Sequence, residues 1–126
     1  MYAISFDAPT RTLHIVTEGF WTIPVTAAFS AELLARGARA RLTHGPFVVL
    51  ADLRKGAIQP TNVIDALAAM MPKALKITSA PIAAVVSSNL AKMQTERYLS
   101  APNCRTFMDM DEAKAWLAAA AQQLAA

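Results

Sequence analysis

The segment Phe47-Val48-Val49-Leu50-Ala51-Asp52-Leu53 is apolar at both sets of alternating positions and runs directly into a polar loop. A second run of the same kind, Ile82-Ala83-Ala84-Val85-Val86-Ser87, also ends in a polar turn. Strands that are apolar on both faces are typical of parallel sheets buried between layers of helices. The two runs therefore predict an α/β domain with a mostly parallel sheet, whose ligands usually bind where the strands end.

Shorter patterns predict the remaining elements. Residues 2–6 and 12–17 alternate between apolar and polar side chains around a short turn, which is typical of an antiparallel hairpin. A final short strand is expected over 104–108, and helical periods begin near Thr22, Thr61, Ser88 and Asp109. We predict the order ββαβαβαβα: a five-stranded, mixed and mostly parallel sheet with helices on both faces, joined by right-handed crossovers.

Helix ends can also be predicted from residue type. Thr61 or Asn62 is expected to cap the second helix, and Ser88 or Asn89 the third. Asp109 and Glu112 have the spacing of a capping box for the last helix. Gly37 is expected near the end of the first helix, and Pro72 is expected to end or kink the second.

Composition limits the class of protein. At 126 residues the chain has the length of one domain, so residues 1–126 are expected to share a single core. A content of 55% hydrophobic and 17% charged residues excludes a disordered chain, and a net charge of +3 is too small to indicate nucleic-acid binding. Cys104 is the only cysteine, which suits a reducing compartment. Without an apolar run near the roughly 20 residues of a membrane span, a cytoplasmic protein is expected.

No motif in the sequence indicates a catalytic, metal-binding or phosphate-binding site. His14 and His44 are far apart and belong to no cluster of metal ligands. Cys104 opens a strand, where a cysteine is usually a small buried apolar residue. The four glycines are too scattered to form a phosphate-binding loop. We therefore predict no catalytic residue, no metal site and no cofactor, and expect a protein that is not an enzyme.

In the order and spacing of its elements the chain resembles the SpoIIAA-like proteins, which have the STAS or anti-sigma-factor-antagonist fold. The segments that carry this resemblance are Val49-Leu50-Ala51-Asp52-Leu53, followed by a helix, and the ending from Arg105-Thr106-Phe107 through Glu112-Ala113-Lys114-Ala115-Trp116-Leu117. Together with the opening hairpin they extend over nearly the whole chain. The resemblance implies a single domain that regulates by binding another protein.

The resemblance also implies a position for regulation. In regulatory members, an aspartate-serine-serine-glycine sequence starts the helix after the central strand, and its second serine is phosphorylated. The matching positions here are Pro60, Thr61, Asn62 and Val63, so asparagine stands at the phosphoacceptor position. This departure argues against the same phosphorylation switch, and Thr61 is the hydroxyl that remains beside it.

The polar residues that follow the two buried strands form our candidate binding surface, which we call the strand-end surface. Asp52 is expected either to be a hydrogen-bonded structural carboxylate or to bind a ligand, and the serines either to cap a helix or to contact a partner. The candidate residues are Asp52, Arg54, Thr61, Asn62, Ser87, Ser88 and Asn89. We expect a binding module for an unidentified protein partner; a carrier of a lipid or other hydrophobic small molecule is the alternative, and an enzyme ranks third.

The second helix has more apolar residues than a single buried stripe needs. Val63, Ala66, Ala69 and Met70 extend its apolar character toward a second face. Exposed apolar faces commonly mark interfaces, and the flexible methionines could instead seat a lipid or close over a cavity. We predict a homodimer with this helix at its interface.

Overall fold

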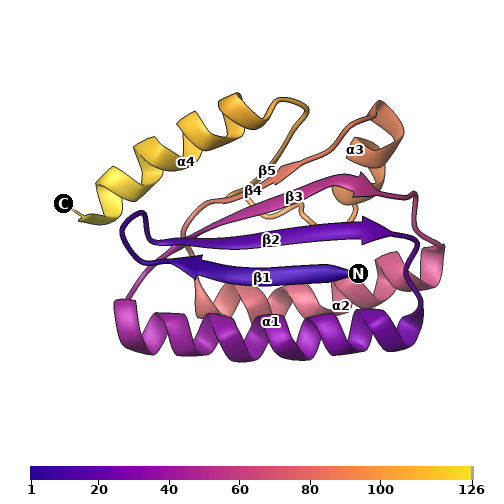
Figure 1. Ribbon diagram of the computed structural model, residues 1–126, viewed down its shortest axis with the longest axis horizontal. Coiled ribbons are helices and arrows are strands. Elements are labelled where there is room, and N and C mark those ends of the chain that lie inside the picture. The colour runs from indigo at the N-terminus through magenta and orange to yellow at the C-terminus, as the bar shows by residue number, and fades with distance from the viewer. Residues whose placement is uncertain (126) are drawn as a thin grey trace.

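A computed structural model describes the backbone of residues 1–125 and the side chains of residues 1–123 (Figure 1). The order of elements is the predicted ββαβαβαβα. The elements are β1 (Tyr2–Asp7), β2 (Thr12–Gly19), α1 (Ile23–His44), β3 (Val48–Gly56), α2 (Thr61–Ile77), β4 (Ile82–Val85), α3 (Asn89–Thr95), β5 (Cys104–Phe107) and α4 (Met110–Ala125). None of the described helices is both long and apolar enough to cross a membrane.

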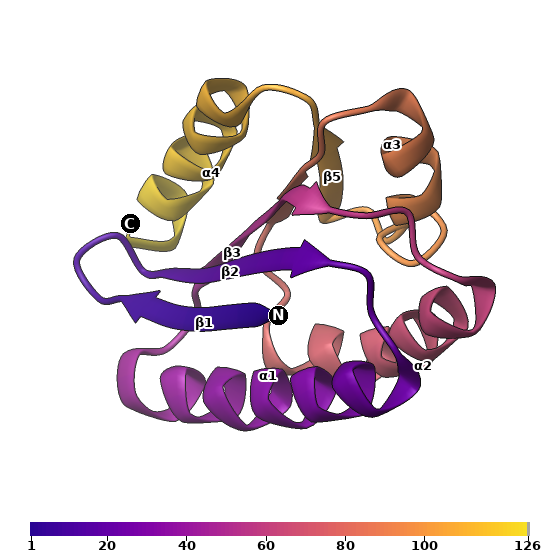
Figure 2. The ribbon, with the colours of Figure 1, turned by 45° about the vertical axis from the view of Figure 1, so that its right-hand side comes forward.

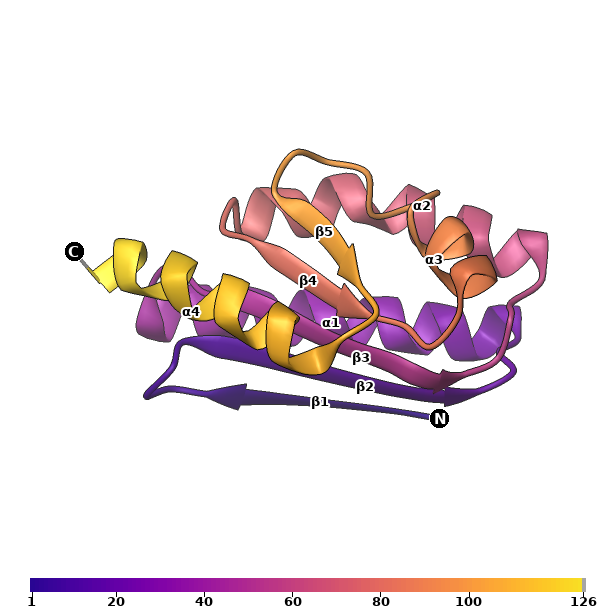
Figure 3. The ribbon, with the colours of Figure 1, turned by 90° about the horizontal axis from the view of Figure 1, so that it is seen from above.

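The five strands lie in the sheet in the same order as in the chain, β1-β2-β3-β4-β5. β1 is antiparallel to β2, and the other neighbours are parallel, as predicted. Each connection between parallel strands therefore steps in the same direction along the sheet. When all crossover connections have the same handedness and step in the same direction, their helices lie on the same face of the sheet. Accordingly, α1 and α2 lie under the sheet (Figures 1 and 3). The segment that follows α3 joins the same core through Tyr98 and Leu99.

The face under α1 and α2 holds the larger core. Buried side chains of β1, β2 and β3, among them Ile4, Ile15 and Val49, meet the two helices there. α2 packs against α1 as well as against the sheet, so it needs two apolar stripes. Val63 is fully buried and Met70 is 8% exposed. The prediction that these residues form an exposed second face for a dimer was therefore wrong, because α1 already covers that face.

The opposite face of the sheet is covered by α4 alone (Figure 2). Val48, Leu50 and Val85 of the sheet pack there against Ala113 and Leu117. A helix is about 10 Å wide and neighbouring strands are about 4.8 Å apart, so one helix cannot cover five strands. α4 lies over β3, β4 and β5, and it leaves the corresponding face of β1 and β2 open. Helices on both faces were predicted correctly, but the two layers are unequal.

Two helix ends differ from the expected ones. α1 continues past Gly37 to His44 because Gly37 is buried in the helix interior, near Ile77 and Phe47. Gly45, with φ of 79°, ends the helix instead. α2 runs through Pro72 to Ile77; Pro72 is exposed, so water can reach the carbonyl that loses its partner. The last helix starts as predicted, since the Asp109 carboxylate accepts hydrogen bonds from the first turn.

Candidate functional site

Asp52 and Arg54 form the best-defined polar contact of the strand-end surface. Arg54 Nε donates to Asp52 Oδ1 and Arg54 Nη2 to Asp52 Oδ2, both at 2.9 Å. The Arg54 backbone N–H also donates to Asp52 Oδ1, at 3.2 Å, which is the structural role expected of this carboxylate. The guanidinium hydrogen bonds, aided by its charge, lower the pKa of Asp52 although burial opposes them. Arg54 is thus engaged by Asp52 rather than simply solvated.

The ends of β3 and β4 and the starts of α2 and α3, which carry the other predicted residues, lie at the same end of the sheet (Figure 1). Ser87 Oγ donates to the Arg54 carbonyl at 3.2 Å, which ties the end of β4 to the end of β3. Ser88 caps α3 by accepting from Ala91 N at 3.1 Å, as predicted, and Asn89 is exposed in its first turn. Thr61 and Asn62 are exposed at the start of α2, but the prediction that one of them caps it was wrong. The cap position belongs to Pro60, which has no side-chain hydrogen bond to offer.

The seven predicted residues nevertheless lie on two sides of the strand ends. Side chains alternate along a strand, so Asp52 shares its face of β3 with Val48 and Leu50, which α4 covers. Thr61 and Asn62 begin a helix that packs on the opposite face. The structure brings Asp52, Arg54 and Ser87 into contact on one side of the strand ends and leaves the start of α2 on the other.

Directly before the start of α2 lies a hydrogen-bond network that the sequence did not reveal. The Gln94 side chain accepts from Gln59 N at 2.8 Å and donates to Gln59 O at 2.7 Å. The Gln59 side chain in turn accepts from Trp21 N at 2.8 Å and donates to Gly19 O at 2.9 Å. We call Gln59 and Gln94 the glutamine clamp. It joins the β2–α1 loop, the β3–α2 loop and α3.

Each segment held by the clamp exposes a large apolar side chain next to the clamped residue. Phe20 precedes Trp21 and is 67% exposed, Ile58 precedes Gln59 and is 40% exposed, and Met93 precedes Gln94 and is 67% exposed. Further exposed apolar residues on the same segments are Ile23 and Leu90. We call these five the strand-end apolar residues. Of the two adjacent aromatic residues, Trp21 is buried against Tyr2 and Phe29, whereas Phe20 is exposed to solvent.

A cavity of about 60 Å³ lies beside the clamp, lined by Trp21, Tyr98 and both glutamines among others. It has room for no more than a few water molecules. Burial raises the pKa of the Tyr98 hydroxyl, which keeps it protonated. This end of the molecule therefore offers a braced surface with exposed apolar side chains rather than a pocket for a small ligand.

The structure gives little support for metal or thiol chemistry. Among the described residues, no three His, Cys, Asp or Glu side chains gather closely enough to hold a metal ion. Partial burial raises the pKa of the Cys104 thiol, so the reactive thiolate is disfavoured.

No family model matches this sequence, and no curated protein matches it significantly. Solved structures do match its fold. An uncharacterised protein of the DUF3478 family with a SpoIIAA-like fold, from Shewanella loihica PV-4, superposes with a TM-score of 0.68 at 17% identity over 92% of this chain and 93% of that one. An anti-sigma factor antagonist from Mycobacterium paratuberculosis gives a TM-score of 0.65 at 13% identity over 93% and 94% of the two chains.

The anti-sigma factor antagonist SpoIIAA, in its unphosphorylated form, gives a TM-score of 0.61 at 11% identity over 91% of this chain and 96% of that chain. The protein therefore has the SpoIIAA-like, STAS-type fold, and the predicted resemblance is confirmed at the level of fold. At these identities the comparisons establish the architecture, and the assignment of a function depends on the site.

Proposed function

We propose that this protein is a non-catalytic cytoplasmic regulatory module that binds another protein through its strand-end surface. The observation that carries the proposal is the glutamine clamp, which holds three segments together while each exposes an apolar side chain beside the clamped residue. Exposed apolar residues on a braced framework suit a protein interface, because binding then orders little additional chain.

The fold comparison supports the same class of function. Two of the matching structures are named anti-sigma factor antagonists, so those proteins act on a protein target. In this chain Thr61 and Asn62 are exposed beside the clamped β3–α2 loop, at the positions that the resemblance associates with regulation. A partner that covers Phe20, Ile58 and Met93 would also cover this helix start. Thr61 is the hydroxyl at which phosphorylation would interfere with such an interface.

The experiment compares two apolar-to-serine changes. Phe20→Ser combined with Met93→Ser removes the two most exposed strand-end apolar residues, and Leu42→Ser is the matched control because Leu42 is 89% exposed near the other end of α1. Tagged wild type and variants are used to capture partners from native lysate, and the partner found is then purified and titrated. We expect wild-type affinity for Leu42→Ser and at least about tenfold weaker binding for the double variant, as for loss of central interface residues.

Asn62→Arg and Ser88→Arg extend the test to the polar part of the surface. Asn62→Arg should weaken the same interaction without altering the thermal unfolding of the protein. Ser88→Arg should weaken it too, but it also removes the side-chain cap of α3 and should therefore lower the unfolding temperature. A partner that binds the double serine variant and both arginine variants as well as wild type would show that the interface lies elsewhere.

A further inference from the structure

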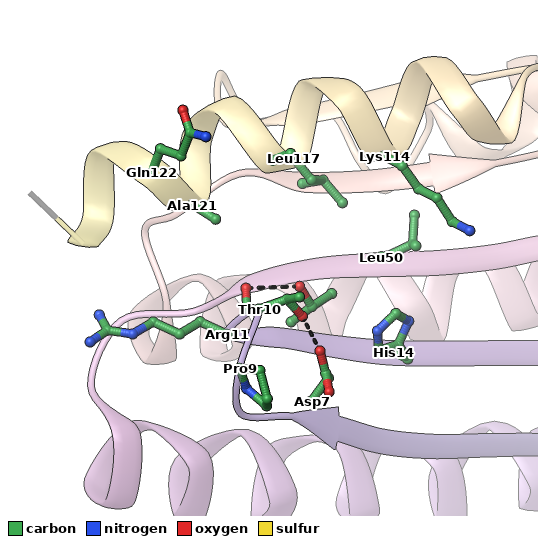
Figure 4. A pocket seen from close by; sticks show the side chains of 12 residues that line it. Asp7, Pro9, Thr10, Arg11, His14, Leu50, Lys114, Leu117, Ala121 and Gln122 are labelled. Carbon is green, nitrogen blue, oxygen red and sulfur yellow. Dashed lines mark hydrogen bonds between the residues drawn. The ribbon is translucent and has the colours of Figure 1, made fainter.

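A second concave feature lies at the other end of the sheet and plays no part in protein binding as proposed above. It is a groove of about 610 Å³ between α4 and the β1–β2 hairpin (Figure 4). It exists because three helices cover one face of the sheet and only α4 covers the other, over β3, β4 and β5. Its volume falls within the range of about 300–1,000 Å³ that is typical of small-molecule sites.

One wall and the floor of this groove are largely apolar. Leu117, Ala118 and Ala121 form the wall on α4, and Leu50 of β3 contributes to the floor. Pro9, in the hairpin turn, lies on the opposite side (Figure 4). The groove therefore offers an apolar strip along α4 that could bury an aliphatic chain.

The polar groups of the groove favour an anion at one end of this strip. Lys114 extends from α4 toward His14 on the floor, and Arg11 lies at the hairpin turn (Figure 4). Among the described residues, neither Lys114 nor Arg11 forms a salt bridge. The acidic residue of the lining, Asp7, accepts a hydrogen bond from the Thr10 hydroxyl. Arg11 extends away from Lys114 at the opposite end of the groove, so Lys114 is the cation of the lining at the end where His14 lies (Figure 4).

We propose that the groove binds a small amphipathic carboxylate, with its carboxylate at Lys114 and its aliphatic chain along Leu117, Ala118 and Ala121. The lysine ammonium supplies a charge-assisted hydrogen bond to the head group, and His14 lies beside it as a second polar contact. The α4 strip contributes affinity through burial of methylene groups. The protein would then have a small-molecule binding site at the end of the sheet opposite its protein-binding surface.

The test is a titration of ¹⁵N-labelled full-length protein with sodium octanoate, followed by two-dimensional NMR. We expect saturable shifts at residues of α4 and the hairpin, and tighter binding along the series hexanoate, octanoate and decanoate, by up to about fourfold per added methylene. Octan-1-ol and octylammonium have the same chain without the anion, and both should bind more weakly than octanoate.

Two matched pairs of variants locate the site. Lys114→Gln should weaken octanoate binding by about fivefold, the effect of losing one exposed charge contact. Lys73→Gln makes the same charge change at an exposed position of α2 and should have no effect on binding. Ala118→Trp should fill the groove and abolish binding, whereas Ala119→Trp, exposed next to it but outside the lining, should not.

Three outcomes would overturn the proposal. They are octanoate shifts confined to the strand-end apolar residues, equal affinity for octanoate and octan-1-ol, and no saturable binding of decanoate at millimolar concentration. Partner binding measured in parallel would be unaffected by Ala118→Trp, so failure of the groove proposal is distinguishable from failure of the proposed function.

Discussion

The side chain of Gln94 pairs with the backbone of Gln59 as a neighbouring strand would, accepting from its N–H at 2.8 Å and donating to its carbonyl at 2.7 Å. The two residues are 35 positions apart in the chain. The pairing satisfies both backbone groups of a loop residue that no strand reaches, and it fixes the β3–α2 loop against α3. The shape of the proposed protein interface therefore depends on one side-chain amide.

Replacing Gln94 tests this dependence. Gln94→Leu leaves the partly buried N–H and carbonyl of Gln59 without their partners, which should cost about 1–3 kcal/mol in the free energy of unfolding measured with urea. Hydrogen exchange at the Gln59 amide should become faster as well. Gln123→Leu makes the same change at an exposed position of α4 and should leave both quantities near wild type. Unchanged exchange at Gln59 would mean that the clamp does not hold the loop.

Replacing glycine with alanine at Gly37 and at Gly45 should change the free energy of unfolding in opposite directions. Gly37 lies inside α1, where an added Cβ would meet Ile77 Cγ2 at 3.5 Å and Phe47 Cζ at 3.8 Å, both ordinary contacts. Gly37→Ala should therefore stabilise the fold by about 0.5–1 kcal/mol. Gly45 has φ of 79° and ψ of −155°, a conformation essentially restricted to glycine, and open space around it, so Gly45→Ala should destabilise through backbone strain alone, by about 1–3 kcal/mol. Urea unfolding of both variants checks the pair, and a loss of stability in Gly37→Ala would contradict the packing described for α1.

The ion pair at the end of β3 predicts a pH dependence. Hydrogen bonds from Arg54 hold the pKa of Asp52 below its usual value of 3.8, so the unfolded chain binds more protons than the folded one near that pH. The stabilisation is fully present above the unfolded pKa and is lost as the pH falls through the folded pKa. The stability difference between wild type and Asp52→Asn should thus be constant above about pH 5 and shrink in more acidic solution. A difference independent of pH would refute this; Asp65→Asn, at an exposed position, is the control.

Helix α2 gives a prediction that replaces the one made from sequence. Val63→Glu and Met70→Glu place a carboxylate in the core between α2, α1 and the sheet, so each should unfold the protein rather than dissociate a dimer. Ala69→Glu, on the exposed side of the same helix, should fold normally. Circular dichroism during thermal unfolding distinguishes the outcomes. If the wild type is a dimer and the Met70→Glu variant is folded and monomeric, α2 would again be the dimer interface.

The edge strand β1 offers another route to self-association. Arg36 of α1 donates from Nη1 to the Ile4 carbonyl at 2.9 Å and so occupies a backbone group at the edge of the sheet. Arg36→Ala should expose that edge and increase self-association over the wild type in sedimentation velocity, whereas Arg39→Ala should not. Sedimentation velocity of the wild type over a series of dilutions also tests the predicted homodimer. Its interface has to be sought outside α2. Identical sedimentation of Arg36→Ala and wild type would show that Arg36 does not protect the edge.

The fold could be predicted because its signals are local. The alternation in residues 2–6 and the run around Leu50 that is apolar on both faces each identify a strand without knowledge of its neighbours. The second apolar stripe of α2 was misassigned because a helical pattern reports that a face is buried but not whether a helix or a second copy covers it. The glutamine clamp had no signal at all, since Gln59 and Gln94 are polar residues that become partners only through the tertiary fold.

The order of strands in the sheet has a consequence for biosynthesis. Because sheet order follows chain order, each new strand emerging from the ribosome can add to an exposed edge, and no pair of strands has to separate to admit another. The layer between α1, α2 and the first strands can therefore form while the C-terminal part is still being made. α4 comes last and closes the second face, so a chain arrested before Met110 would present Val48 and Leu50 uncovered to the quality-control machinery of the cell.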